Sequence, residues 1–151
     1  MVSFTMNLAN LWNKFVEAVT EHFRYLEEEF NFVRTLTKVP NVIYESDKLQ
    51  MQIFYDVEGR FELDLALRRL PDTRMSLSFG IDMLMYLQGL ADATMSPFPS
   101  TPEELEFEVK RLAEDLRKYG AALLGGDLRD FDRMEQIERE FVAKLHEGKN
   151  E

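Results

Sequence analysis

The sequence contains no cysteine among its 151 residues. Disulfide bonds, thiolate nucleophiles and cysteine-ligated zinc or iron–sulfur sites are therefore excluded. Only two histidines occur, His22 and His146, and they are far apart in the chain. The chain also lacks a glycine-rich phosphate loop and a Gly-x-Ser-x-Gly nucleophile motif. We therefore predict a protein that is not an enzyme and that has no catalytic residue, no metal site and no cofactor.

Basic residues are scarce, with 18 Lys and Arg against 28 Asp and Glu, and the formal net charge is -10. Phosphate binding needs clustered Lys and Arg, so we expect neither nucleic acid nor an anionic membrane surface as a partner. The charge is compatible with a basic protein partner and equally with plain solubility. No apolar run approaches the ~20 residues of a membrane helix, and Met1–Trp12 has no signal-peptide pattern. A cytoplasmic protein is the expectation.

Core material is abundant, because 45% of the residues are hydrophobic and 12 are Phe. A chain of this length can bury about two thirds of its unfolded surface in one core. We predict one domain over residues 1–148 and a frayed tail over residues 149–151.

Three segments alternate apolar and polar residues with period two, which is typical of strands buried on one face. They are Val42–Ser46, Leu49–Asp56 and Arg60–Leu67. A two-residue loop between the first two would place Tyr44 opposite Met51. A three-residue loop over residues 57–59 would place Tyr55 opposite Phe61, with Gly59 in the left-handed conformation that such loops need.

Four helical segments surround these strands in the sequence. The first is predicted over Asn7–Glu29, with Asn7 or Asn10 as its cap, and the second over Leu77–Ala91, capped by Ser76. The third runs from the Thr101-Pro102 start signal to the Gly125-Gly126 stop. The fourth is predicted over Leu128–Glu147, between the cap Asp127 and the stop Gly148. Residues 30–37 are consistent with a further strand or with an extended connector. The predicted fold class is α+β, an antiparallel sheet of three or four strands with about four helices packed mainly on one face.

The polar face of the sheet is the candidate partner-binding surface. On it we expect a mainly acidic and amide set with one apolar anchor: Glu45, Gln52, Phe54, Glu62 and Asp64. Grouped carboxylates can act as acid and base, but neighbouring Gln50 and Arg60 indicate a wet surface. The alternative is an ordinary solvated sheet face.

The helix predicted over Leu77–Ala91 is apolar on most sides. Such a helix either lies in the core or is shared with another subunit. In the second case Phe79, Met83 and Leu87 would form a dimer face.

Two stretches carry a resemblance to a known group of proteins. Val42-Ile43-Tyr44-Glu45-Ser46 with its hairpin, and the segment from Leu116 to Asp127 that contains Tyr119-Gly120 and Gly126-Asp127, resemble small bacterial proteins assigned to the immunity proteins of toxin systems. The resemblance implies a bacterial cytoplasmic protein that neutralises a toxin by blocking it. It supplies no binding residues.

The expected function is therefore that of a non-enzymatic protein-binding module of the immunity or inhibitor type, directed at a basic partner. Two alternatives stay open. One is a homodimeric structural or regulatory protein, and the other is a small-molecule binder with a pocket between the sheet and the helices.

Overall fold

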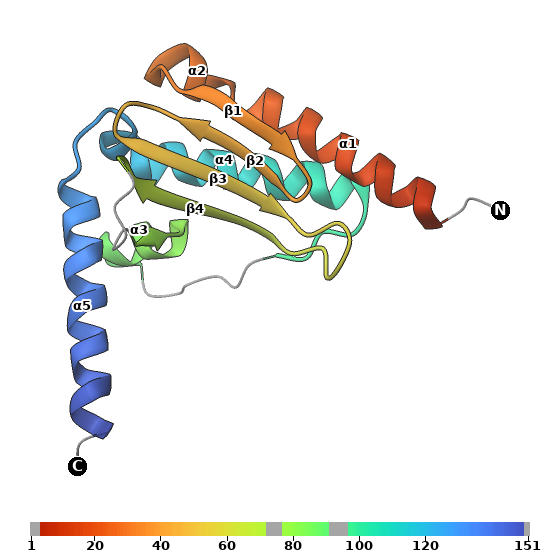
Figure 1. Cartoon of the computed structure of the whole chain (residues 1–151). Coiled ribbons are helices and arrows are strands. Elements are labelled where there is room, and N and C mark those ends of the chain that lie inside the picture. Colours follow the sequence, from red (N-terminus) through yellow and green to blue (C-terminus); the bar gives the residue numbers. More distant parts are fainter. Residues whose placement is uncertain (1–3, 72–76, 91–96, 150–151) are drawn as a thin grey trace.

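The computed structural model describes residues 4–71, 77–90 and 97–149 of an α+β protein (Figure 1). Its sheet is an antiparallel meander in which the strands lie side by side in chain order. The strands are β1 Val33–Lys38, β2 Asn41–Glu45, β3 Leu49–Tyr55, β4 Leu63–Arg69 and β5 Ser78–Phe79. The helices are α1 Phe4–His22, α2 Arg24–Phe30, α3 Ile81–Leu87, α4 Pro102–Leu124 and α5 Arg129–Lys149. The sheet thus has five strands, where the sequence predicted three or four.

One face of the sheet is the centre of the core. Alternate residues of β2, β3 and β4 point to it and are fully or almost fully buried: Val42, Tyr44, Leu49, Met51, Ile53, Tyr55, Leu63, Leu65 and Leu67. Helices α1 and α4 lie across this face (Figure 1) and contribute their apolar stripes, including Phe15, Val19, Val109 and Leu116. The predicted alternation of buried and outward positions is confirmed.

The first hairpin has the predicted register, with Tyr44 opposite Met51. The Ser46 N–H donates to the Leu49 carbonyl at 2.9 Å. The Ser46 hydroxyl accepts from the N–H groups of Lys48 and Leu49. This side-chain turn explains why the loop closes without a favoured primed-turn pair.

The predicted second hairpin was wrong by two residues. Tyr55 lies opposite Leu63, not Phe61, and the connection spans residues 56–62. Asp56 organises this loop: its carbonyl accepts from the Phe61 N–H at 2.8 Å, and its carboxylate accepts from the Arg60 N–H at 3.0 Å. Phe61 takes the left-handed conformation expected of Gly59. A shift of two residues keeps every side chain on its own face, so the pattern alone could not reveal it.

The N-terminal region has one helix more and one strand more than the minimal prediction. The predicted helix over Asn7–Glu29 is split at Phe23 into α1 and α2, and α1 begins before either predicted cap. Asn31 ends α2 in the left-handed conformation, where a short amide side chain is tolerated. Residues 33–38 form β1 beside β2, so the strand alternative for residues 30–37 was correct from Val33 onwards, whereas Phe30 belongs to α2.

The helix predicted over Leu77–Ala91 was also wrong at its start. Ser78 and Phe79 form β5, with Phe79 opposite Leu67, and α3 begins after Gly80. The predicted cap Ser76 and end Ala91 lie outside the described residues. Short apolar runs suit strand and helix equally, and only the open edge of β4 selects the strand.

Helix α4 is as predicted. The Thr101 hydroxyl accepts from the Glu104 N–H at 3.2 Å, Pro102 is the first helical residue, and the helix ends at Gly125 and left-handed Gly126. Asp127 then accepts from the Arg129 N–H at the start of α5. Helix α5 continues past the predicted stop to Lys149.

Candidate functional site

The outer face of the sheet is the surface opposite the core. It carries Ile43, Glu45, Gln50, Gln52, Phe54, Asp64, Ala66 and Arg68, all half-buried or exposed. No described helix covers it, and Figure 1 shows the described helices behind or beside the sheet. Its centre is held by side-chain hydrogen bonds, from Gln52 to Asn41 at 2.6 Å and from Arg68 to Gln50 at 2.7 Å.

Of the five predicted partner-binding residues, Gln52, Phe54 and Asp64 lie near one another on the outer face, and Glu45 lies apart from them. Phe54 lies directly opposite Asp64, and Gln52 lies at the centre, between Ile43 and Ala66. Glu45 lies opposite Gln50. Gln50 is four residues from Phe54 along β3, or about 13 Å at the rise of a strand.

Glu62 precedes β4 and lies in the hairpin loop, not on the strand as predicted. Its carboxylate raises the pKa of Asp64, whereas Glu45 lies opposite Gln50, at the other end of the face from Asp64. The predicted grouping of Glu45 with Glu62 and Asp64 is therefore not formed, and no acid–base pair can be built from Glu45.

Asp64 acquires a different neighbour, Asp82, which the sequence did not single out. Burial raises the pKa of Asp64, and the carboxylates of Glu62 and Asp82 raise it further. Its Oδ1 accepts from the Leu65 N–H at 2.8 Å. We name Glu62, Asp64 and Asp82 the acidic corner. Asp82 was missed because it is in the first turn of α3, whose start was predicted too early.

Within the described part of the chain, no member of the acidic corner forms an ion pair. Carboxylates that repel one another and are partly desolvated are stabilised by an added positive charge. The corner is therefore receptive to a cation supplied from outside.

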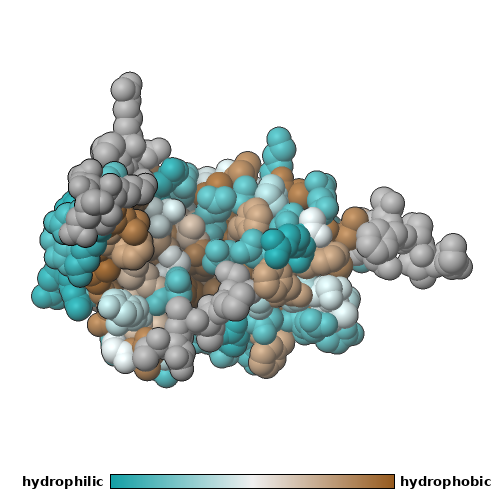
Figure 2. All heavy atoms as spheres, turned by 90° about the horizontal axis from the view of Figure 1, so that it is seen from below, coloured by the Kyte–Doolittle hydropathy of each residue, from teal (hydrophilic) through white to brown (hydrophobic). Residues whose placement is uncertain are grey.

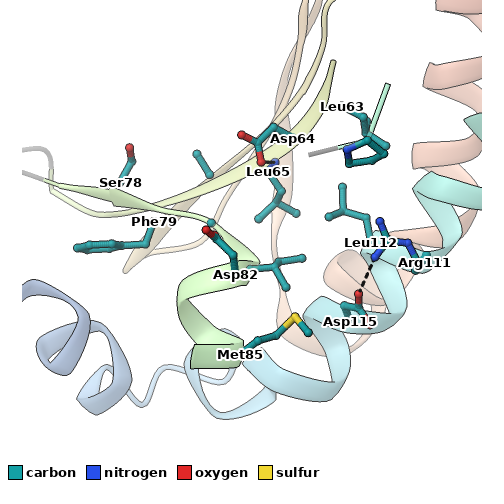
Figure 3. A pocket seen from close by; sticks show the side chains of 14 residues that line it. Leu63, Asp64, Leu65, Ser78, Phe79, Asp82, Met85, Arg111, Leu112 and Asp115 are labelled. Atoms are coloured by element: carbon teal, nitrogen blue, oxygen red, sulfur yellow. Dashed lines mark hydrogen bonds and ion pairs between the residues drawn. The ribbon is translucent and has the colours of Figure 1, made fainter. Parts of the chain in front are cut away.

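A hollow of about 410 Å³ adjoins the acidic corner at the edge of β4 (Figure 3). It exists because β5 pairs only with Leu67 and Arg68, which leaves the first half of β4 without a further strand among the described residues. At its far end the Leu63 N–H donates to the Pro97 carbonyl at 3.0 Å. In Figure 3 side chains reach the hollow from β4, from the start of α3 and from α4.

The far wall of the hollow carries a further carboxylate. Arg111 lies 3.5 Å from Asp115, and both belong to α4. Burial raises the pKa of Asp115, while the Arg111 guanidinium opposes that rise. Met85 and Leu112 supply apolar surface between the two acidic ends. The hollow combines apolar walls with carboxylates, a composition suited to a small cationic molecule.

Glu21, His22 and Glu106 are the one group of described residues whose ligand atoms lie close enough to share a metal ion, within 4.8 Å of one another. Glu106 is already engaged, by His22 Nε2 at 2.6 Å and by Lys14 Nζ at 3.0 Å. These hydrogen bonds lower the pKa of Glu106. Because an ammonium occupies the place of a cation, the group is best described as an ion-pair network that links α1 to α4.

The three residues of the predicted dimer face do not share one helix surface. Phe79 is buried in β5, where its ring packs on Phe131 with centroids 5.3 Å apart. Met83 and Leu87 are half-buried on α3. The exposed apolar residue of α3 is Tyr86.

No protein-family model matches this chain, and no curated protein or solved structure shows significant similarity to it. None of the helices in the described ranges is both long and apolar enough to cross a membrane.

Proposed function

We propose that the protein is a non-enzymatic binding module that docks a basic protein partner on the outer face of its sheet. The observation that carries this proposal is a sheet face that no described helix covers, on which the apolar residue Phe54 lies directly opposite Asp64, a carboxylate with no ion pair among the described residues. An inhibitor of the immunity type acts by blocking a surface, so it needs no catalytic group. The resemblance of the sequence to such proteins agrees with this mode of action.

The arrangement also defines what a partner must present. An apolar side chain would pack on Phe54, and Lys or Arg side chains beside it would meet the acidic corner. A charged rim around an apolar centre is the usual anatomy of a protein interface. The net charge of -10 would accelerate association with a basic protein and make it sensitive to salt.

A pair of charge reversals tests the proposal. Glu62→Lys with Asp82→Lys removes two carboxylates of the acidic corner and leaves Asp64, which has a structural hydrogen bond, in place. The matched control is Glu17→Lys with Glu28→Lys, since both residues are exposed on helices outside the outer face and both double variants have the same net charge. Each protein is immobilised and exposed to lysate of the source cell at low and at high salt.

The expected result is one protein that binds the wild type and the control in low salt, leaves in high salt, and fails to bind the corner variant. A Phe54→Ser variant should bind the same protein at least about tenfold more weakly, as expected when the apolar anchor of an interface is removed. If the corner variant and the control, which have the same net charge, capture equal amounts of the protein, the acidic corner does not select it. That result would overturn the proposal.

A second candidate function is small-molecule binding in the hollow beside β4. It is favoured by a volume within the range of ligand pockets, which begins near about 300 Å³. Thermal-shift measurements with a panel of small amines test it. The expected result is a rise in melting temperature that Asp115→Asn reduces, and a flat panel would exclude this candidate.

A further inference from the structure

Helix α5 begins in the core and ends far from it. Phe131 and Met134 are fully buried, whereas Phe141 and Leu145 are 58% and 53% exposed. Figure 1 shows the helix running away from the sheet, with its second half beside no other described element. Figure 2, viewed from below, shows apolar atoms gathered beside hydrophilic ones at this end of the molecule. We call residues 137–149 the α5 arm.

The apolar face of the arm continues the face that enters the core. Steps of seven and eleven residues from Met134 lead to Phe141 and Leu145, and both steps return to nearly the same side of a helix. Val142, which is also exposed, widens the stripe. Single exposed apolar residues are ordinary, but a row of them on one face marks an interaction surface.

The arm also lacks the contacts that normally stabilise a helix. Isolated helices of about 12–15 residues are marginal in water, and most helices depend on packing of an apolar face. The arm is of this length, and its apolar side chains Phe141, Val142 and Leu145 are exposed in the described chain. A partner that covers the stripe would supply the missing stabilisation.

The charge distribution indicates which partner fits. Helix α5 has six acidic and five basic residues, whereas the whole chain has 28 acidic and 18 basic ones. Two copies of a chain with net charge -10 repel each other over most of their surfaces. They repel least along α5, and a nearly neutral helix offers no attraction to a strongly basic or acidic protein.

From these observations we propose that the α5 arm pairs with the α5 arm of a second copy of this chain, in antiparallel orientation. A two-fold axis near Phe141 would place the two Phe141 rings together and each Ile137 near Leu145 of the other copy. Such a contact is self-complementary, as closed dimers require. On one flank Glu140 would lie near Lys144 of the second copy.

Antiparallel pairing is favoured over parallel pairing by the position of the net negative charge, most of which lies outside α5. It places the two acidic sheet-bearing bodies at opposite ends of the paired arms. The arm is about 20 Å long at 1.5 Å per residue, more than two Debye lengths of about 8 Å at physiological salt. Parallel arms would hold the two acidic bodies side by side.

The α5 contact uses no residue of the outer face on which the proposed function depends. It also moves the dimer contact away from Phe79, Met83 and Leu87, where the sequence had suggested it. The outer face of each copy would remain accessible, so the dimer would present two copies of the partner-binding surface.

Sedimentation velocity over a concentration series tests the contact. Phe141→Asp is compared with Phe107→Asp, because Phe107 is an equally accessible phenylalanine on α4, 65% exposed. We expect the wild type and Phe107→Asp to dimerise with rising concentration, and Phe141→Asp to dimerise at least about tenfold more weakly. Circular dichroism should show that both variants remain folded. A monomeric wild type at the highest concentration, or equal weakening by both substitutions, would overturn the inference.

Cross-linking tests the orientation, and the absence of cysteine makes it unambiguous. Proteins with Ile137→Cys and Leu145→Cys are treated with a short thiol-reactive linker, separately and mixed. The antiparallel contact predicts more dimer from the mixture than from either protein alone. Ala143→Cys, on the opposite side of the helix, should give little product. Preferential self-linking of each variant would contradict the antiparallel arrangement.

Discussion

The two faces of the sheet are made by the same strands, yet they differ in nearly every physical respect. Ile53 and Met51 point inward and are completely buried, while their neighbours Gln52 and Phe54 point outward and keep contact with solvent. The inner face is covered by α1 and α4, and no described helix lies on the outer face (Figure 1). The difference shows that the helical layer buries one face of the sheet and leaves the other in contact with solvent.

The largest expected effect comes from truncating neighbouring residues on the two faces. Ile53→Ala should lower the free energy of unfolding by about 2–5 kcal/mol, because it removes buried methyl groups and leaves a cavity. Gln52→Ala should lower it by less than about 1 kcal/mol, because only the hydrogen bond to Asn41 is lost. Denaturant unfolding measures both. Similar losses at the two positions would mean that the outer face is also covered.

A smaller effect is expected when the hydroxyl group of Tyr55, a buried residue of the inner face, is removed. Its hydroxyl donates to the Pro99 carbonyl at 2.7 Å, and burial raises its pKa to about 12, so it stays protonated at neutral pH. Tyr55→Phe leaves that carbonyl unpaired and should cost about 1–3 kcal/mol in the same unfolding measurement. Tyr86→Phe, at an exposed ring of α3, is the control and should change nothing measurable.

Asp64 has a structural role on the outer face, because its carboxylate accepts a hydrogen bond from the Leu65 N–H. Asp64→Ala should cost about 1 kcal/mol, because the Leu65 N–H at the open edge of β4 loses its acceptor. Asp64→Asn keeps an acceptor oxygen and should restore most of that stability. Hydrogen exchange at the Leu65 amide should accelerate in the alanine variant only. Equal protection in the two variants would show that the carboxylate does not shield this edge.

The smallest effect concerns the ion pairs that hold α1 to α4 behind the inner face. His22 and Lys14 lower the pKa of Glu106, so the unfolded chain takes up this proton at higher pH than the folded one. The associated stability is present above the unfolded pKa, which is about 4.3. It is lost as the pH falls through the folded pKa.

We therefore expect Glu106→Gln to be less stable than the wild type at neutral pH, by up to about 1 kcal/mol, since the carboxylate is one-third exposed. The difference should shrink as the pH falls below about 4. Thermal unfolding at a series of pH values measures it. A difference that does not change with pH would indicate lost packing instead of a lost ion pair.

Much of the fold could be predicted from local patterns. Period-two alternation identified the three central strands and their buried faces, and Thr101-Pro102 with Gly125-Gly126 located both ends of α4. The candidate site could be predicted only in part. Gln52, Phe54 and Asp64 were placed correctly on the outer face, but Glu62 was assigned to a strand that begins after it, and Asp82 was missed.

The sequence by itself determined which residues are buried within β2, β3 and β4, because successive side chains must point to opposite faces whatever the strand is paired with. Only the tertiary structure decided the register of the second hairpin, since a shift by two residues leaves that pattern unchanged and the Asp56 loop selects between the alternatives. It likewise decided that Ser78 and Phe79 join the edge of β4, and that Phe141 and Leu145 project beyond the core. These outcomes depend on where other segments come to lie in space, which the periodicity of one segment does not encode.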